Sequence, residues 1–175
     1  MNPNLFFIDF EASSFDGYPI EVGIAKLHPM GTIMHEAYWI RPTGEWMLKH
    51  EWDPVATKEH GLNLNIIMDH SQNPDWVCKG LNNHFDDNVV FCRSLKHDGR
   101  WLSMLYKAAG MECPFKIVEY QHLLDKFGVN AYEHTKIINV AVDFLTENGE
   151  EVGNRYRPSA IMMAAEVKFA RKWMA

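Results

Sequence analysis

Two carboxylates stand two residues apart in an apolar stretch near the start of the chain. The segment FFIDFEASSFD, residues 6–16, places Asp9 and Glu11 among phenylalanine and isoleucine residues that are typical of a buried strand. Residues two apart point to the same side of a strand, so both acids can reach one shared cation. Like charges that close repel unless a metal neutralises them, and hard carboxylate oxygens suit Mg²⁺ or Mn²⁺. The alternative is an edge strand with solvated acids, but an edge strand is seldom so apolar.

Two cations need further ligands, and the later part of the sequence offers candidates. Asp98, in SLKHDGRWL, opens a predicted helix, where an Asp is also a favourable helix cap. A second helix, predicted over 131–147, carries three polar candidates: His134, Asn139 and Asp143. A single helical His is more often an ordinary surface residue than a catalyst. Each of these residues is a weak signal when taken alone.

Five strands are predicted to position these residues. Three lie in the first third of the chain, where turn residues at Asp16-Gly17 and Pro29-Met30-Gly31 separate them and favour an antiparallel meander. Two short apolar runs further on indicate buried strands. The predicted strands cover residues 4–11, 18–28, 32–41, 88–92 and 115–119.

Helical patterns dominate the remainder. Asn73 followed by Pro74 is typical of a helix start, and Gly110 of a helix end. Asn130 with Glu133 three residues later has the spacing of a capping box. The predicted helices cover residues 73–85, 97–110, 130–149 and 158–173. Strands followed by helices that surround them predict an α/β fold with a central mixed sheet of about five strands, flanked by helices.

Composition limits the class of protein. The chain has 175 residues and no repeat or linker, so we expect one domain over residues 1–175. It has neither an apolar run of membrane-spanning length nor a signal-peptide pattern, so we expect no membrane partner. Its three cysteines are interpreted as reduced thiols, which is typical of a cytoplasmic protein. The net charge of −6 argues against sequence-blind binding to long duplex DNA, while short or single-stranded nucleic acid needs fewer phosphate contacts.

The order of the candidate residues resembles that of the DEDDh exonucleases, the ribonuclease T and DnaQ-like superfamily with a ribonuclease H-like fold. FFIDFEASS matches the first motif, KHDGRWLSML the second and HTKIIN the third, so the resemblance covers most of the chain. PIEVGIA also looks like the second strand of that family. EHGL, residues 59–62, lies where the family often has a His-Gly-Ile/Leu turn that touches the terminal base.

The resemblance implies 3′→5′ removal of mononucleotides from single-stranded or short RNA or DNA with two divalent cations, Mg²⁺ or Mn²⁺. The implied ligands are Asp9, Glu11 and Asp98, with Asn139 in the fourth position. One cation would generate a hydroxide from water and the other would stabilise the charge on the leaving 3′ oxygen. His134 would be the general base for the water.

The third motif departs from the family pattern. The family has His, four residues, then Asp, whereas this chain has Asn139, a neutral ligand that removes one negative charge from the site. Asp143 lies one helical turn further on and is the alternative fourth ligand, which would reach the cation through a bridging water molecule. A natural replacement and an engineered one both fit the sequence. The departure favours a second interpretation, a catalytically silent nucleic-acid-binding or adaptor domain, and a third also stays open, an α/β interaction domain whose acids are solvated.

Substrate contacts are predicted from aromatic residues and the His-Gly turn. Phe15, His60 and Leu62 are the candidates, because unpaired bases stack on aromatic faces. The sequence does not discriminate RNA from DNA. Met162 and Met163 in the last helix indicate internal packing or a dimer face, since ribonuclease T-like relatives are often homodimers.

Overall fold

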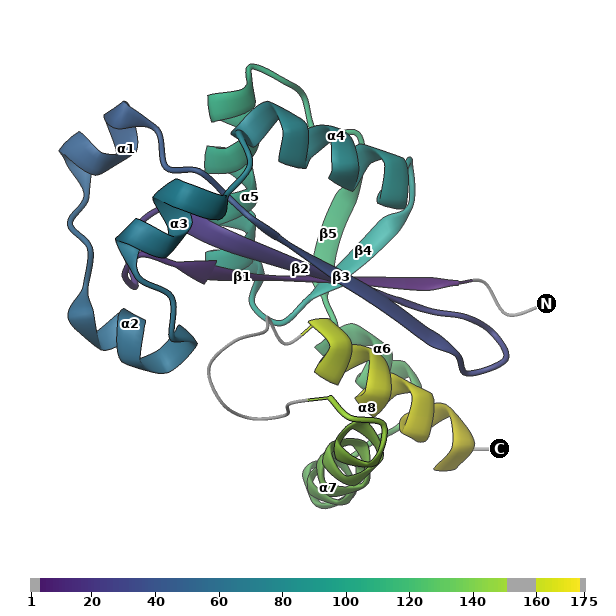
Figure 1. The fold of residues 1–175 in the computed structure, drawn as a ribbon. Coiled ribbons are helices and arrows are strands. Elements are labelled where there is room, and N and C mark those ends of the chain that lie inside the picture. The colour runs from purple at the N-terminus through teal and green to yellow at the C-terminus, as the bar shows by residue number, and fades with distance from the viewer. Residues whose placement is uncertain (1–3, 151–159, 174–175) are drawn as a thin grey trace.

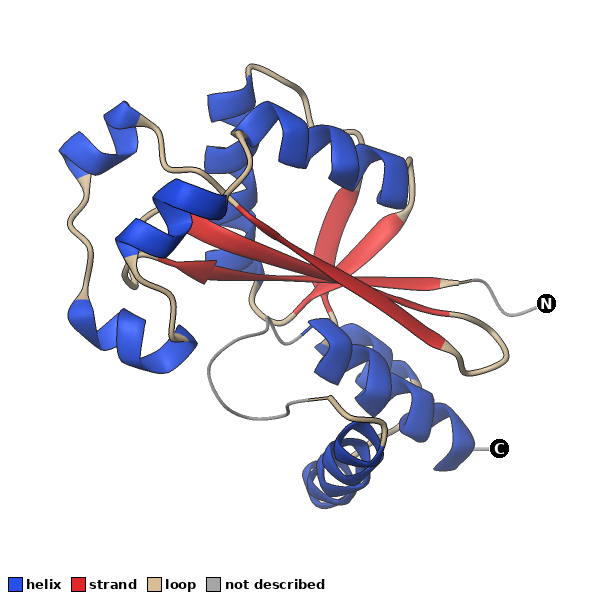
Figure 2. Ribbon diagram, viewed as in Figure 1, coloured by secondary structure: helices blue, strands red, loops and turns tan. Residues whose placement is uncertain are grey.

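The computed structural model describes residues 4–150 and 160–173. In chain order its elements are β1 (Leu5–Ala12), β2 (Pro19–Leu27), β3 (Ile33–Trp39), α1 (Gly44–Lys49), α2 (Pro54–His60), α3 (Leu64–His70), α4 (Pro74–Phe85), β4 (Val89–Cys92), α5 (Leu95–Ala109), β5 (Lys116–Glu119), α6 (Gln121–Lys126), α7 (Ala131–Glu147) and α8 (Ala160–Trp173). All five predicted strands are present within two residues of their predicted ends, as Figure 2 shows in red.

The strands form one mixed sheet in the order β3-β2-β1-β4-β5. β1, β2 and β3 pair antiparallel, which confirms the predicted meander, and β4 pairs parallel to β1 and to β5. β1 is therefore the central strand. The predicted α/β fold, a central mixed sheet of five strands flanked by helices, is confirmed.

Alternate residues of β1 pack against different helix layers. Phe6, Ile8 and Phe10 belong to the core cluster that includes the buried residues of α4 and α5. Phe7 belongs to the cluster that includes the buried residues of α6 and α8. Figure 1 shows these two layers, with α4 and α5 on one side of the sheet and α6, α7 and α8 on the other. The two-residue period of a strand therefore directs Asp9, two residues after Phe7, toward the α8 layer.

Helix α8 approaches the sheet through small side chains. Ala160, Ala164 and Ala170 are buried in the same cluster as Phe7, and Met163 is completely buried among them. Met163 thus has the internal packing role that the sequence left open. The side chain of an alanine adds little thickness, so the α8 backbone lies close to β1 and β2.

Several helix ends agree with the sequence signals. The capping box at Asn130 and Glu133 is present, and α5 ends at Gly110, whose φ of 64° is in the left-handed region. Helix α5 begins at Leu95, two residues before its predicted start. The predicted start of the last helix, at residue 158, lies outside the described residues.

Four short helices, α1, α2, α3 and α6, are absent from the sequence prediction. Each has six or seven residues, which is too short for an apolar period to stand out. Local signals were nevertheless present at α2, since Asp53 caps its start, Pro54 is its first residue and Gly61 ends it in the left-handed region. None of the helices in the described residues combines the length and apolar character of a membrane span.

Candidate active site

Asp9 and Glu11 lie on the same side of β1 and are both partly buried. In the antiparallel register with β2, Glu11 stands directly opposite Glu21, which is only 2% exposed. Directly opposed like charges destabilise a strand pair. Burial, followed by the neighbouring charges of Asp9 and Glu21, raises the pKa of Glu11 to about 8. Glu11 therefore holds a proton near neutral pH unless a positive charge comes close.

Asp98 joins this pair from the first turn of α5. Its carboxylate is 3% exposed and accepts a hydrogen bond from the Ser94 backbone N–H at 2.9 Å. Burial and the charge of Asp9 raise the pKa of Asp98 to about 7, against the lowering effect of the backbone hydrogen bonds and Arg93. Because β4 runs parallel to β1, the helix that follows β4 starts beside the carboxyl end of β1. The fold therefore places Asp98 close enough to Asp9 and Glu11 to interact electrostatically with both.

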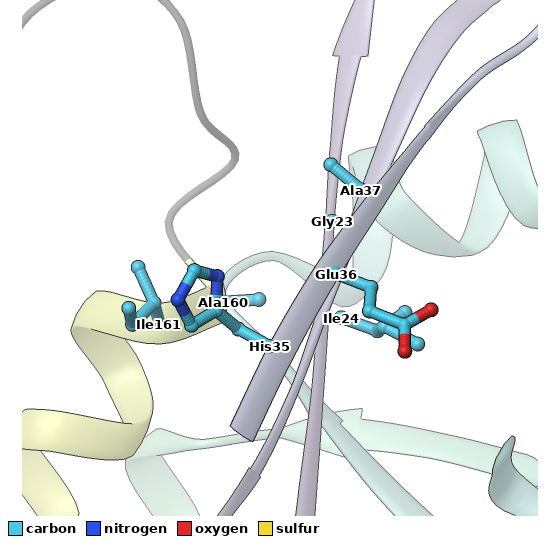
Figure 3. Close-up of a pocket in the computed structure, with 7 residues that line it drawn as sticks. All are labelled: Gly23, Ile24, His35, Glu36, Ala37, Ala160 and Ile161. Atoms are coloured by element: carbon cyan, nitrogen blue, oxygen red, sulfur yellow. The ribbon is translucent and has the colours of Figure 1, made fainter. Parts of the chain in front are cut away.

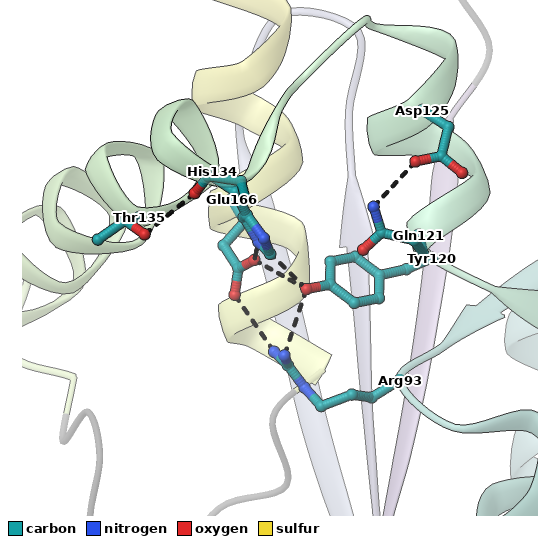
Figure 4. A network of polar contacts seen from close by, with 8 residues as sticks. Arg93, Tyr120, Gln121, Asp125, His134, Thr135 and Glu166 are labelled. Atoms are coloured by element: carbon teal, nitrogen blue, oxygen red, sulfur yellow. Dashed lines mark hydrogen bonds and ion pairs between the residues drawn. The ribbon is translucent and has the colours of Figure 1, made fainter.

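A second group of polar residues surrounds Glu166, an acid of α8 that the sequence analysis did not select. Glu166 is 1% exposed, and three side chains converge on it in Figure 4. Its Oε1 accepts from Arg93 Nη2 at 3.2 Å, and its Oε2 accepts from the Tyr120 hydroxyl at 3.1 Å. The same Oε2 lies 2.7 Å from His134 Nε2. His134 is thus held by a carboxylate from the neighbouring helix.

Arg93 connects this group to the acids of β1. The parallel register between β1 and β4 ends with the pair Ile8 and Cys92. Asp9 and Arg93 are the next residues of the two strands and therefore lie beside each other. The guanidinium lies 5.0 Å from the centre of the Tyr120 ring, a cation–π distance. Burial lowers the pKa of Arg93, but the charges of Tyr120, Glu166 and Asp9 together raise it above its usual range.

Asn139, the predicted fourth ligand, lies in the middle of α7. It is exposed on α7, and the five residues that separate it from His134 turn a helix by about 140°. The buried stripe of α7 contains Ile137, Ala141 and Leu145, so Asn139 projects from the other side. Asp143 is exposed as well. The role of Asn139 as the fourth ligand stays a prediction, and the acid that contacts His134 is Glu166.

The predicted substrate contacts lie beyond the carboxyl end of β1. Phe15 is 67% exposed, and its ring centre is 4.5 Å from that of His97 on α5. His60 and Leu62 are 3% and 4% exposed, and the His60 Nδ1 accepts a hydrogen bond from the Leu62 N–H at 3.1 Å. Phe15 therefore offers a surface for a base, whereas His60 and Leu62 are covered. Their contact with a substrate stays a prediction.

One well-defined pocket is separate from these acids. It has a volume of about 210 Å³ and lies between β2, β3 and the start of α8 (Figure 3). His35, Glu36, Ala160 and Ile161 are among the residues that line it. None of the candidate acids lines this pocket, so we do not place the chemistry there.

The carboxylates fit a divalent cation chemically. Three buried or partly buried acids, two of them with raised pKa values, are hard oxygen donors whose mutual repulsion a cation would relieve. Within residues 4–150 and 160–173, no three His, Cys, Asp or Glu side chains form a ready-made metal cage. The donor set therefore suits Mg²⁺ or Mn²⁺, and binding would draw the carboxylates together.

Comparison of the sequence with known protein families finds no matching family, and no curated protein matches it. Solved structures do match. E. coli exonuclease I in complex with a dT13 oligonucleotide matches with a TM-score of 0.64 and 9% identity, over 97% of this chain and 41% of that chain. This chain thus spans about two fifths of exonuclease I.

Two smaller proteins match over nearly their whole length. Exonuclease X in complex with 5′ overhanging duplex DNA has a TM-score of 0.61 and 14% identity, with 97% of this chain and 92% of that chain covered. The nuclease domain of 3′hExo, a DEDDh family member bound to rAMP, has a TM-score of 0.62 and 15% identity, with 98% and 90% covered. The chain has the fold of the DEDDh exonucleases.

Proposed function

We propose that this protein is a metal-dependent nuclease, and specifically a 3′→5′ exonuclease that releases mononucleotides from single-stranded or short RNA or DNA. The observation that carries the proposal is the group of Asp9, Glu11 and Asp98, whose charges interact in a fold shared with exonucleases. Buried like charges are costly to maintain, so a function that uses them is the best account of their presence.

In this proposal the three acids bind the divalent cation through their carboxylate oxygens. When bound, such a cation activates water and stabilises negative charge on a leaving oxygen. The raised pKa values mean that Glu11 and Asp98 must release protons before they can act as ligands. Cation binding should therefore strengthen as the pH rises from about 6 to about 8.

His134 is proposed as the general base. Because its Nε2 contacts Glu166, the imidazole would accept the proton of the attacking water through Nδ1. Glu166 would then act as a positioning residue that fixes the orientation of the ring, as a carboxylate does for many catalytic histidines. Phe15, which is exposed, is the proposed stacking surface for a base near the 3′ end.

The test uses a 5′-labelled RNA and the DNA of the same sequence, incubated with Mg²⁺ and then with Mn²⁺. We expect a ladder that shortens from the 3′ end, and the two substrates compared side by side give the sugar preference. Asp9→Asn should abolish the ladder, while Asp125→Asn, the same change at an exposed residue of α6, should leave it unchanged. Absence of cleavage with both cations and both substrates would contradict the proposal.

A second function, nucleic-acid binding without catalysis, is favoured by one specific observation. Glu166 and His134 are already bound to each other, and Arg93 completes the charge balance around Glu166. A site that satisfies its own charges in this way needs no cation at Glu166. Tight binding of a fluorescent oligonucleotide, with no turnover under saturating Mn²⁺, would establish this alternative.

A further inference from the structure

The loop that joins β1 to β2 carries Phe15, the proposed stacking surface, and the base of this loop is fixed by close packing. The Ser13 carbonyl oxygen accepts a hydrogen bond from the Asp53 N–H at 2.8 Å. A Cβ atom at Gly17 would lie 2.7 Å from the backbone nitrogen of Ser14, so only glycine fits there without a shift of the backbone. The packing at its base therefore restricts the path of the loop.

Arg100 on α5 holds the tip of the loop through two contacts. Its Nη2 donates to the Phe15 carbonyl oxygen at 2.5 Å, and its Nη1 donates to the Asp16 carboxylate at 3.0 Å. The guanidinium also lies 5.4 Å from the centre of the Trp101 ring, a cation–π distance. Trp101 in turn donates from Nε1 to the Gly17 carbonyl oxygen at 3.1 Å. Three successive residues of the loop are thus bound by two successive residues of one helix.

The same face of α5 supports the Phe15 ring. The ring centre of His97 is 4.5 Å from that of Phe15 and 5.8 Å from that of Trp101. Residues four apart share one face of a helix, so the ring and the backbone of the loop lie against the same part of α5. Phe15 is nevertheless 67% exposed, so much of its ring stays accessible to a base.

The helix turn that holds Phe15 also carries one of the proposed metal ligands. Asp98 lies between His97 and Arg100 in the sequence and is 3% exposed. A base stacked on Phe15 and a phosphate held near Asp98 would therefore depend on the same turn of α5 for their spacing. A guanidinium donates from a rigid planar fork, so the two contacts of Arg100 fix the loop in direction as well as in distance.

We infer that Arg100 is a positioning residue for the substrate. It fixes Phe15 relative to Asp98, and through Phe15 it places the 3′-terminal base of a single-stranded nucleic acid. This inference rests on the proposed function and adds to it a residue that acts through another side chain. Without Arg100 the Phe15 ring can still stack, but its position is no longer fixed, so binding weakens although no phosphate contact is lost.

The test is a double-mutant cycle on the full chain, measured by binding. The probe is a short single strand, DNA or RNA, with 2-aminopurine at its 3′ end, whose fluorescence falls when the base stacks. A phosphorothioate at the last linkage slows cleavage in Mg²⁺. Phe15→Ala should weaken binding about 5- to 100-fold, the range for one base–aromatic stack.

Arg100→Gln should weaken binding about three- to tenfold and reduce the quenching of 2-aminopurine, because the stack is less well ordered. In the Phe15→Ala protein the same substitution should have no further effect. An equal loss of affinity with and without Phe15 would overturn the inference, because Arg100 would then act independently of the stacking surface. Asp16 is 85% exposed, so its ion pair contributes little to stability and Arg100→Gln should fold.

Two further measurements distinguish positioning from direct contact with a phosphate. Arg100→Lys keeps the charge but loses the planar fork, so it should bind nearly as weakly as Arg100→Gln, and it replaces that variant in the cycle if Arg100→Gln does not fold. The salt dependence of binding should be the same in Arg100→Gln as in the wild type, whereas a lost phosphate contact would lower its slope by about 0.7–1. Lys107→Gln, which removes a charge from the last turn of α5, is the matched control and should bind like the wild type. Wild-type affinity in Arg100→Lys, with a reduced slope in Arg100→Gln, would make Arg100 a phosphate ligand and refute the inference.

The outcomes separate this inference from the proposed function. A chain that binds the probe with the expected cycle but cleaves no unmodified strand would support the inference and remove the catalysis. Cleavage by the wild type, together with independent effects of Arg100 and Phe15, would remove the inference and leave the nuclease intact. A wild-type chain that neither binds nor cleaves a single strand would remove both.

Discussion

Glu11 should make the metal-free protein less stable as the pH rises. Its pKa is about 8 in the folded protein against 4.5 for an unperturbed glutamate, chiefly because burial disfavours the charged form. Between these two values the folded protein keeps a proton that the unfolded chain has released. The folded state therefore binds more protons, and its free energy of unfolding falls as the pH rises through this window. Glu11→Gln keeps the shape of the side chain and removes the titration.

The size of the effect follows from the pKa difference. A rise from 4.5 to about 8 corresponds to at most about 4–5 kcal/mol, at 1.36 kcal/mol per pKa unit. Glu11 is only partly buried, so solvent screening should reduce this to about 2 kcal/mol. For a chain of this length 1 kcal/mol moves the melting temperature by about 2–4 °C, so Glu11→Gln should melt about 4–8 °C above the wild type at pH 8.5.

The assay is thermal unfolding followed by circular dichroism in EDTA at pH 5 and at pH 8.5. The advantage of Glu11→Gln should be small at pH 5, where Glu11 is protonated, and should reach its full size at pH 8.5. Glu147→Gln, the same substitution at an exposed residue of α7, provides the matched control. An advantage that is equal at both pH values would refute the reasoning, because it would come from packing rather than from charge.

Four further predictions concern the site. Asp9→Ala should abolish cleavage without lowering the melting temperature of the metal-free protein, because the relief of repulsion with Glu11 offsets the contacts that the Asp9 side chain makes. A variant that still cleaves in Mg²⁺ would show that Asp9 is not a ligand. His134→Ala should lower turnover by about 10²–10⁴-fold in single-turnover assays with Mn²⁺ affinity retained, and a collapse of that affinity would make it a ligand. Asn139→Asp should change neither Mn²⁺ affinity nor cleavage rate, since residue 139 is exposed and lies off the buried stripe of α7; a gain in both would establish it as a ligand. Glu166→Gln should lower the free energy of unfolding by about 1–3 kcal/mol in urea titrations, because Arg93 and His134 lose the buried carboxylate with which they pair. An unchanged urea midpoint would contradict these ion pairs.

Local patterns were sufficient to predict the central part of the fold. The two-residue period of β1 placed Asp9 and Glu11 on one side, and this side carries both acids in the structure. The capping signals of α7 identified its first turn, because a cap depends only on residues three apart. The short helices α1 to α3 escaped prediction because six or seven residues contain too few apolar positions to define a period.

The candidate site was harder to predict because its contacts are long-range. Arg93 and Glu166 are 73 residues apart, and no spacing rule joins a residue at the end of β4 to one in α8. Glu166 has one sequence signal, its position as a lone acid within the otherwise apolar AIMMAAEV, but no His lies at a helical spacing from it. Asn139 was selected because HTKIIN has the right local spacing, but the packing of α7 determines which of its sides faces the acids.

The alanines of α8 have a consequence for how this site can vary. Ala164 and Ala165 are completely buried next to Glu166, so they act as a spacer of minimal thickness between the helix and the layers around it. A larger residue at Ala164 would push the helix outward and take Glu166 with it, lengthening its reach to Arg93 without altering any charged group. The electrostatic balance of the site is thus adjustable by side-chain volume alone, at positions that take no part in the chemistry.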